Sequence, residues 1–74
     1  MDPQAALDAF NDPSTSRASR ADLAQGLLTW LERGGFRPTG TLAPHRIAAM
    51  QNHNDHAGAG AALLVNDLLE TRQA

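Results

Sequence analysis

The best-supported helix of this chain is predicted by LAQGLLTWLERGGF, residues 23–36. At about 100° per residue, its apolar side chains fall on one face of a helix, with Trp30 at the margin. The members of this face are Leu23, Ala24, Leu27, Leu28 and Leu31. The ending ERGGF predicts a Schellman motif in which Gly35 is left-handed and Phe36 contacts Leu31. This pattern predicts an amphipathic helix, and it explains the glycine pair without a ligand.

The rest of the chain also favours helices. No segment alternates apolar and polar residues with a period of two, and Ile47 and Val65 are the only β-branched aliphatic residues. Asp2 followed by Pro3 is typical of a helix start. We predict an all-α fold, a small bundle of three main helices plus a short N-terminal helix, in a single helical domain over residues 1–74. The approximate helices are residues 3–11, 17–34, 43–53 and 56–72.

Two helix starts are less well defined. Asp12, which precedes a proline, favours an early start of the second helix, whereas Ser19 and Asp22 resemble a capping box and favour a late one. The sequence does not choose between them. Thr41 is the expected cap of the third helix, with Pro44 in its first turn.

The last helix contains AALLVNDLLE, residues 61–70. Its apolar residues spread over a broad arc that comprises Ala61, Leu64, Val65, Leu68 and Leu69, with the polar residues opposite. Leu63 falls among the polar residues, so we expect it to be exposed. The alanines and glycines that precede it, such as Gly58 with Ala62, are expected to let another helix approach closely.

The segment QNHNDHAGAG, residues 51–60, concentrates the groups that are capable of chemistry. His53 and His56 have a spacing compatible with two metal ligands, but a zinc site needs at least three. We interpret Asn54 and Asp55 as the stop and start of two helices. The glycines lack the lysine of a P-loop and do not match G-x-G-x-x-G. We therefore expect no metal, cofactor or catalytic residue here, although metal binding or pH sensing by the two histidines in a complex stays open.

The charge is uneven along the chain. Six arginines and no lysine oppose eight acidic residues, for a net charge of −2. The middle of the chain is the basic part, with Arg17, Arg20, Arg33, Arg37 and Arg46. These residues suggest an alternative function as a nucleic-acid-binding regulator. The low pI of about 5.8 weighs against it, because nucleic-acid-binding domains usually have a pI above about 9.

The size of the chain limits what it does. With 74 residues and no cysteine it has a thin core and no disulfide to support it. Small domains of this kind frequently associate to bury further surface. An enzyme is not expected, because a chain this short would have difficulty forming a substrate pocket, which usually needs at least about 300 Å³. No apolar run approaches the roughly 20 residues of a membrane span, and the acidic start does not resemble a signal peptide, so a soluble cytoplasmic protein without membrane contact is expected.

The leading hypothesis is a small non-enzymatic protein-interaction module. It would act as an adaptor, regulator or inhibitor by binding another protein or a second copy of itself. The predicted contact residues are Trp30, Leu63 and Leu69. A second alternative is a minor subunit that stabilises a larger assembly. The sequence specifies neither the partner, nor the oligomeric state, nor the biological process.

Overall fold

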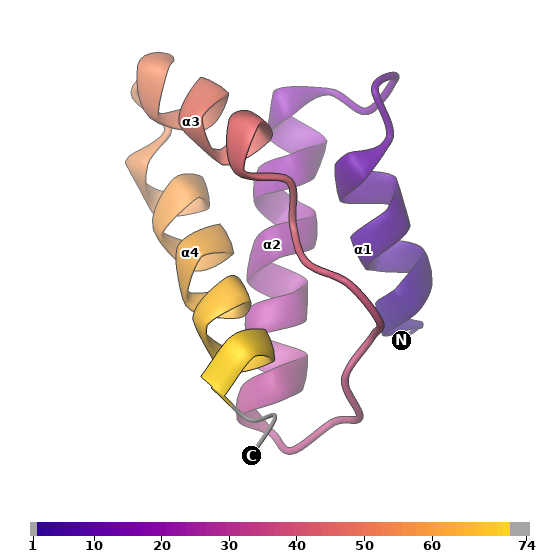
Figure 1. Ribbon diagram of the computed structural model, residues 1–74. Coiled ribbons are helices and arrows are strands. Elements are labelled where there is room, and N and C mark those ends of the chain that lie inside the picture. Colours follow the sequence, from indigo (N-terminus) through magenta and orange to yellow (C-terminus); the bar gives the residue numbers. More distant parts are fainter. Residues whose placement is uncertain (1, 72–74) are drawn as a thin grey trace.

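Helices account for all the regular structure in the computed structural model, which describes residues 2–71. They are α1 (Pro3–Asn11), α2 (Arg17–Glu32), α3 (Pro44–Asn52) and α4 (His56–Thr71), and the described residues contain no strand. The predicted all-α bundle with a short N-terminal helix is confirmed. In Figure 1, α1, α2 and α4 stand side by side, α2 and α4 run in the same direction, and α3 lies across their upper end. The predicted end of the last helix, residue 72, lies outside the described residues.

The core lies between the helices and receives side chains from all four. Its fully buried larger members are Phe10, Leu27, Leu42, Met50 and Val65. Small residues bring α4 close to its neighbours, as the sequence predicts: a Cβ on Gly58 would meet Ala21 of α2 at 2.8 Å. None of the described helices is long and apolar enough to cross a membrane.

The start of α2 lies between the two positions that the sequence proposes. Ser16 is the N-cap, and its hydroxyl accepts a hydrogen bond from the Ser19 amide at 3.2 Å. Asp12 instead holds the turn after α1, where its Oδ1 accepts hydrogen bonds from the Ser14 amide and hydroxyl. Asp12 and Ser19 therefore both form local hydrogen bonds, but neither residue is the N-cap of α2.

The Schellman motif at the end of α2 lies one residue earlier than the sequence predicts. Gly34, not Gly35, is left-handed with φ of 83°, and the Gly35 amide donates to the Trp30 carbonyl at 2.9 Å. Phe36 packs on Trp30 in an edge-to-face pair with ring centroids 5.5 Å apart. A Cβ on Gly35 would collide with the Trp30 indole, so the second glycine lets the ring cover the turn.

The junction of α3 and α4 confirms the predicted stop and start. Asn54 is left-handed with φ of 62°, and the next amide, that of Asp55, donates to the Met50 carbonyl at 2.8 Å. The Asp55 carboxylate then accepts a hydrogen bond from the Gly58 amide at 3.0 Å. One helix thus ends in a Schellman motif and the next begins with an aspartate cap in three residues.

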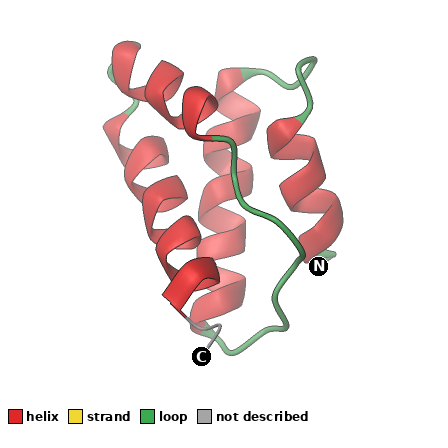
Figure 2. Cartoon of the chain, in the orientation of Figure 1, coloured by secondary structure: helices red, strands yellow, loops and turns green. Residues whose placement is uncertain are grey.

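The α2–α3 loop, residues 33–43, runs between α1 and α4 in front of α2 (Figure 2). Its backbone is bound by three side-chain carboxamides, each of which both donates and accepts at 2.8–3.2 Å. The pairs are Gln4 with Thr39, Asn11 with Thr41 and Ala43, and Asn66 with Leu42. The expected Thr41 cap is wrong: α3 begins at Pro44, so its N-cap is Ala43, which makes no side-chain cap bond. Asn11 binds the backbone of the segment before the helix, at the Thr41 carbonyl and the Ala43 amide.

Candidate interaction surface

Two neighbouring leucines are exposed on the side of α4 that faces away from the bundle. Leu63 is 50% exposed and Leu64 53%, whereas every other leucine of residues 2–71 is buried or half-buried. We call their surroundings the α4 outer face, which consists of His56, Ala57, Gly60, Leu63, Leu64 and Asp67. In Figure 1, α4 lies at one edge of the molecule, and no other helix covers this side.

The two leucines border two different grooves. Leu63 lines a groove of about 340 Å³ between α4 and α3, together with Ile47 and Ala48. Leu64 lines a groove of about 390 Å³ between α4 and α2, together with Leu28. The outer face is therefore a ridge of apolar side chains with a hollow on each side. A helix or extended segment of another chain fits such a relief.

The two glycines of α4 have different surroundings. Gly58 is buried, and a Cβ there would meet Met50 at 2.6 Å, so the fold requires its small size. Gly60 is on the outer face, and a Cβ there would have no atom within 4 Å. A glycine in a helix interior costs about 1 kcal/mol relative to alanine. Nothing within the described chain compensates for that cost at Gly60.

The structure places the three predicted contact residues in different environments. Leu63 lies on the outer face. Leu69 is a correction: it is 3% exposed and belongs to the core, because it lies on the side of α4 that carries Val65. Trp30 is half-buried at the end of α2, where its indole N–H donates to the Phe36 carbonyl at 2.9 Å.

Sequence reasoning missed Leu64 as a surface residue. It placed Leu64 inside the apolar arc of α4, but the contact of α4 with α2 leaves that edge of the arc uncovered. The signal available in the sequence was the breadth of the arc, since it is wider than the stripe that a single neighbouring helix buries. Phe36, which is 68% exposed in the α2–α3 loop, was also missed, because the left-handed residue was expected at Gly35 and is Gly34.

Arg20 has a structural role at the end of α1. Its Nε donates to the Phe10 carbonyl at 2.8 Å, and its Nη2 donates to the Asp12 carbonyl at 2.7 Å. Burial lowers the pKa of the Arg20 guanidinium, and the nearby Arg46 lowers it further. The pKa of Asp12 is lowered mainly by its hydrogen bonds from Ser14. This corner of the molecule is an internal hydrogen-bond network at the junction of α1 and α2.

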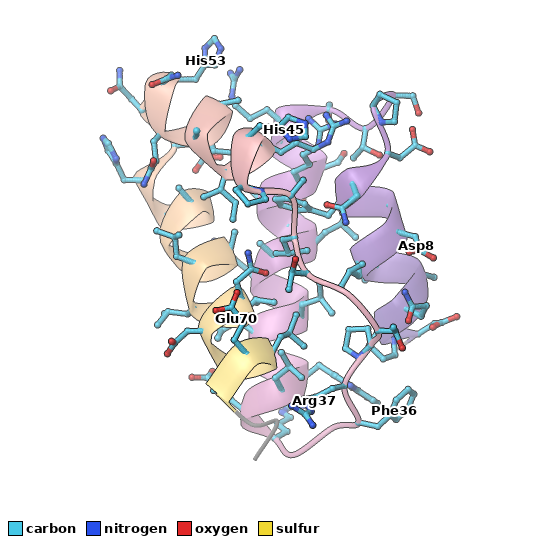
Figure 3. The ribbon with its side chains drawn as sticks, viewed as in Figure 1. Asp8, Phe36, Arg37, His45, His53 and Glu70 are labelled. Atoms are coloured by element: carbon cyan, nitrogen blue, oxygen red, sulfur yellow. The ribbon has the colours of Figure 1, made fainter. Side chains whose placement is uncertain are left out.

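The structure does not bring the five candidate arginines together. Arg17 and Arg33 flank α2 at opposite ends, which are separated by about 24 Å at 1.5 Å per residue. Arg46 lies in α3, near Arg20, with its Nε buried and without a hydrogen-bond partner. Arg37 lies at the other end, where it donates to the Leu69 carbonyl at 3.4 Å (Figure 3). The arginines therefore form no continuous basic surface.

The histidines do not form part of a metal cluster. Within residues 2–71, no group of three or more histidine, aspartate or glutamate side chains is placed to hold a metal ion. His53 and His56 are both exposed, at the turn before α4 and at its first residue. Asp55, which lies between them in the sequence, is directed to the Gly58 amide.

The surface with the most unexplained features is thus the α4 outer face, where exposed leucines, an unexplained glycine and two grooves occur together. Comparisons of this chain with models of protein families, with curated proteins and with solved structures found no match.

Proposed function

We propose that this protein is a small non-enzymatic interaction module that binds another protein chain through the α4 outer face. The observation that carries the proposal is the exposure of Leu63 and Leu64, 50% and 53%, on one helix between two grooves. Full burial of a leucine side chain contributes about 1.5–3 kcal/mol, so a partner that covers both gains a useful part of its binding energy from them.

The grooves support binding of a chain in preference to a small molecule. Their volumes of about 340 and 390 Å³ exceed the roughly 300 Å³ that a chain of this size was expected not to reach, so volume does not exclude a small ligand. Both are, however, open hollows on either side of one helix, and the leucines lie between them. A small-molecule site usually encloses most of its ligand, with a few convergent polar groups. A ridge with two flanking hollows instead matches the knobs and holes of helix packing.

The nucleic-acid alternative has weaker support. Phosphate recognition needs cations along one surface, and the five arginines are divided between the two ends of α2. Arg20 and Arg37 also bind backbone carbonyls of their own chain. Protein binding through α4 instead uses Leu63 and Leu64, whose apolar side chains are exposed.

Photo-crosslinking in cells tests the proposal. A photoreactive phenylalanine analogue replaces Leu64 in one variant and Ala5 in the control, because Ala5 is an exposed residue of α1, a helix on the other side of the bundle. We expect a discrete protein adduct from position 64 and none from position 5. Adduction at neither position, or equally at both, would contradict the proposed function.

A further inference from the structure

Four residues of the α4 outer face recur at helical spacing and form one line along the helix. His56, Gly60, Leu63 and Asp67 follow one another at spacings of four, three and four residues, which places them in one seam. The structure leaves this seam uncovered: His56, Leu63 and Asp67 are exposed and Gly60 is half-buried. Along the helix, these four residues are basic, small, large and acidic in turn. When two copies of the seam are aligned in opposite directions, each small residue faces a large one and each basic residue faces an acidic one.

We propose that the partner is a second copy of this chain, with the two α4 helices packed antiparallel around a twofold axis. The inference rests on the proposed function and names the partner of the same face. In this arrangement Gly60 faces the partner's Leu63, and His56 faces the partner's Asp67. The twofold symmetry repeats each contact, so four pairs form from one seam about 16 Å long.

Size complementarity is the first argument. Leu63 is half exposed and projects from α4, whereas a Cβ on Gly60 would meet nothing within 4 Å. Antiparallel packing inserts the large side chain of each copy where the other copy has no side chain. This packing gives a steric reason for the glycine at position 60, which the fold of the single chain does not explain. A parallel pairing would place Leu63 against Leu63 and leave a gap between the glycines.

Charge complementarity is the second argument. His56 is the first residue of α4 and His53 lies in the turn before it, whereas Asp67 and Glu70 lie toward the C-terminal end of α4. Figure 3 shows the turn with His53 well separated from Glu70. Antiparallel packing brings the histidine end of each copy to the carboxylate end of the other, and it also opposes the two helix dipoles. Parallel packing would instead place carboxylate beside carboxylate.

A size swap tests the proposed contact. Gly60→Leu fills the space that the partner's Leu63 occupies, and symmetry imposes this overpacking twice. In sedimentation velocity over a concentration series, we expect the dimer dissociation constant to rise by about 30-fold or more. The double variant Gly60→Leu, Leu63→Gly restores one large and one small residue to each pair, and we expect it to dimerise again.

The same variant controls for folding. An added Cβ at position 60 would meet no atom of a neighbouring element within 4 Å, and leucine is a better helix former than glycine. At concentrations where the parent chain is monomeric, Gly60→Leu should therefore unfold at the same temperature as the parent or higher. Ala5→Leu on the exposed side of α1 is the matched control for added apolar surface, and we expect its dimerisation to be unchanged.

Disulfide trapping tests the orientation, since the chain has no cysteine of its own. A mixture of Gly60→Cys and Leu63→Cys chains is oxidised, and antiparallel packing predicts that the mixed 60–63 disulfide dominates. Dominance of the 60–60 disulfide would overturn the proposed arrangement.

Two further results would overturn the second-copy partner. One is a monomer at every concentration, and the other is a dimer that Gly60→Leu leaves unchanged. If the chain is monomeric but position 64 crosslinks to a different protein, this inference fails and the proposed function stands. Absence of any crosslink contradicts the proposed function itself.

Discussion

The connections on the two sides of α3 begin alike and then differ. Both start with a Schellman motif, in which Gly34 after α2 and Asn54 after α3 take the left-handed conformation. After Asn54, the next residue already caps α4. After Gly34, the chain runs for nine further residues before α3 begins, and it crosses the space between α1 and α4 (Figure 1).

The two connections are stabilised by different kinds of interaction. Residues 53–55 bond to backbone groups within five positions in the sequence. The α2–α3 loop bonds to carboxamides that are 24–35 residues away, from Gln4, Asn11 and Asn66. Leu42 and Pro38 of the loop are also buried. The short connection is thus a local structure, whereas the long one exists only where the helices are already assembled.

This difference bears on stability. A local turn contributes the energy of a cap or a backbone conformation, which is about 1 kcal/mol. A loop that fills part of the core contributes the burial of its side chains and the satisfaction of its backbone groups. We therefore expect substitutions in the long connection to reduce stability more than substitutions in the short one.

The largest effect is expected for Leu42→Ala. Leu42 is fully buried, so its truncation leaves a cavity in the core and should lower the free energy of unfolding by about 2–5 kcal/mol. Urea denaturation followed by circular dichroism measures this change. Gln51→Ala is the control, since truncation of an exposed side chain outside the proposed seam should cost well under half as much. Equal losses from the two variants would show that the α2–α3 loop does not contribute to the core.

Asn66→Ala should follow, with a loss of about 1–3 kcal/mol. The substitution removes two hydrogen bonds, of 2.8 and 2.9 Å, and leaves the amide and carbonyl of Leu42 without these partners. The same denaturation assay measures the loss, and Gln51→Ala on the exposed side of α3 provides the comparison. If Asn66→Ala and Gln51→Ala are equally stable, the carboxamide does not hold the loop.

Asp55→Ala tests the short connection and should cost about 1 kcal/mol. It removes the side-chain acceptor of the Gly58 amide at the start of α4. Asp55→Asn keeps an acceptor oxygen and should recover most of the loss. A loss larger than that of Leu42→Ala would reverse the proposed order of the two connections.

The smallest effect is expected for Asn54→Gly, and at this position the size of the effect depends on the replacement. Asn54→Ala places a Cβ-bearing residue without a short polar side chain in the left-handed region, which should cost roughly 1 kcal/mol. Asn54→Gly is compatible with this φ and should change stability by only a few tenths of a kcal/mol. Thermal unfolding of the two variants side by side measures the difference, and similar midpoints for both would refute the left-handed assignment.

The candidate surface was only partly predictable from the sequence. The helical wheel of residues 61–70 separates Leu63 from the apolar arc, and it is exposed as expected. The same wheel cannot show where the arc is covered, so it grouped Leu64, which is exposed, with Leu69, which is buried. The position of α2 against α4 decides between them, and that position depends on contacts such as Ala21 with Gly58.

Local structures are the part of this fold that can be predicted from the sequence alone. The helical class, the Asp2 cap and the Asn54-Asp55 junction follow from side chains that act within a few residues of their own position. The path of the α2–α3 loop, the role of the three carboxamides that bind it and the exposed edge of α4 depend instead on how the helices assemble. They were not predictable because a carboxamide 24–35 residues from its partner carries no local signal of that partner.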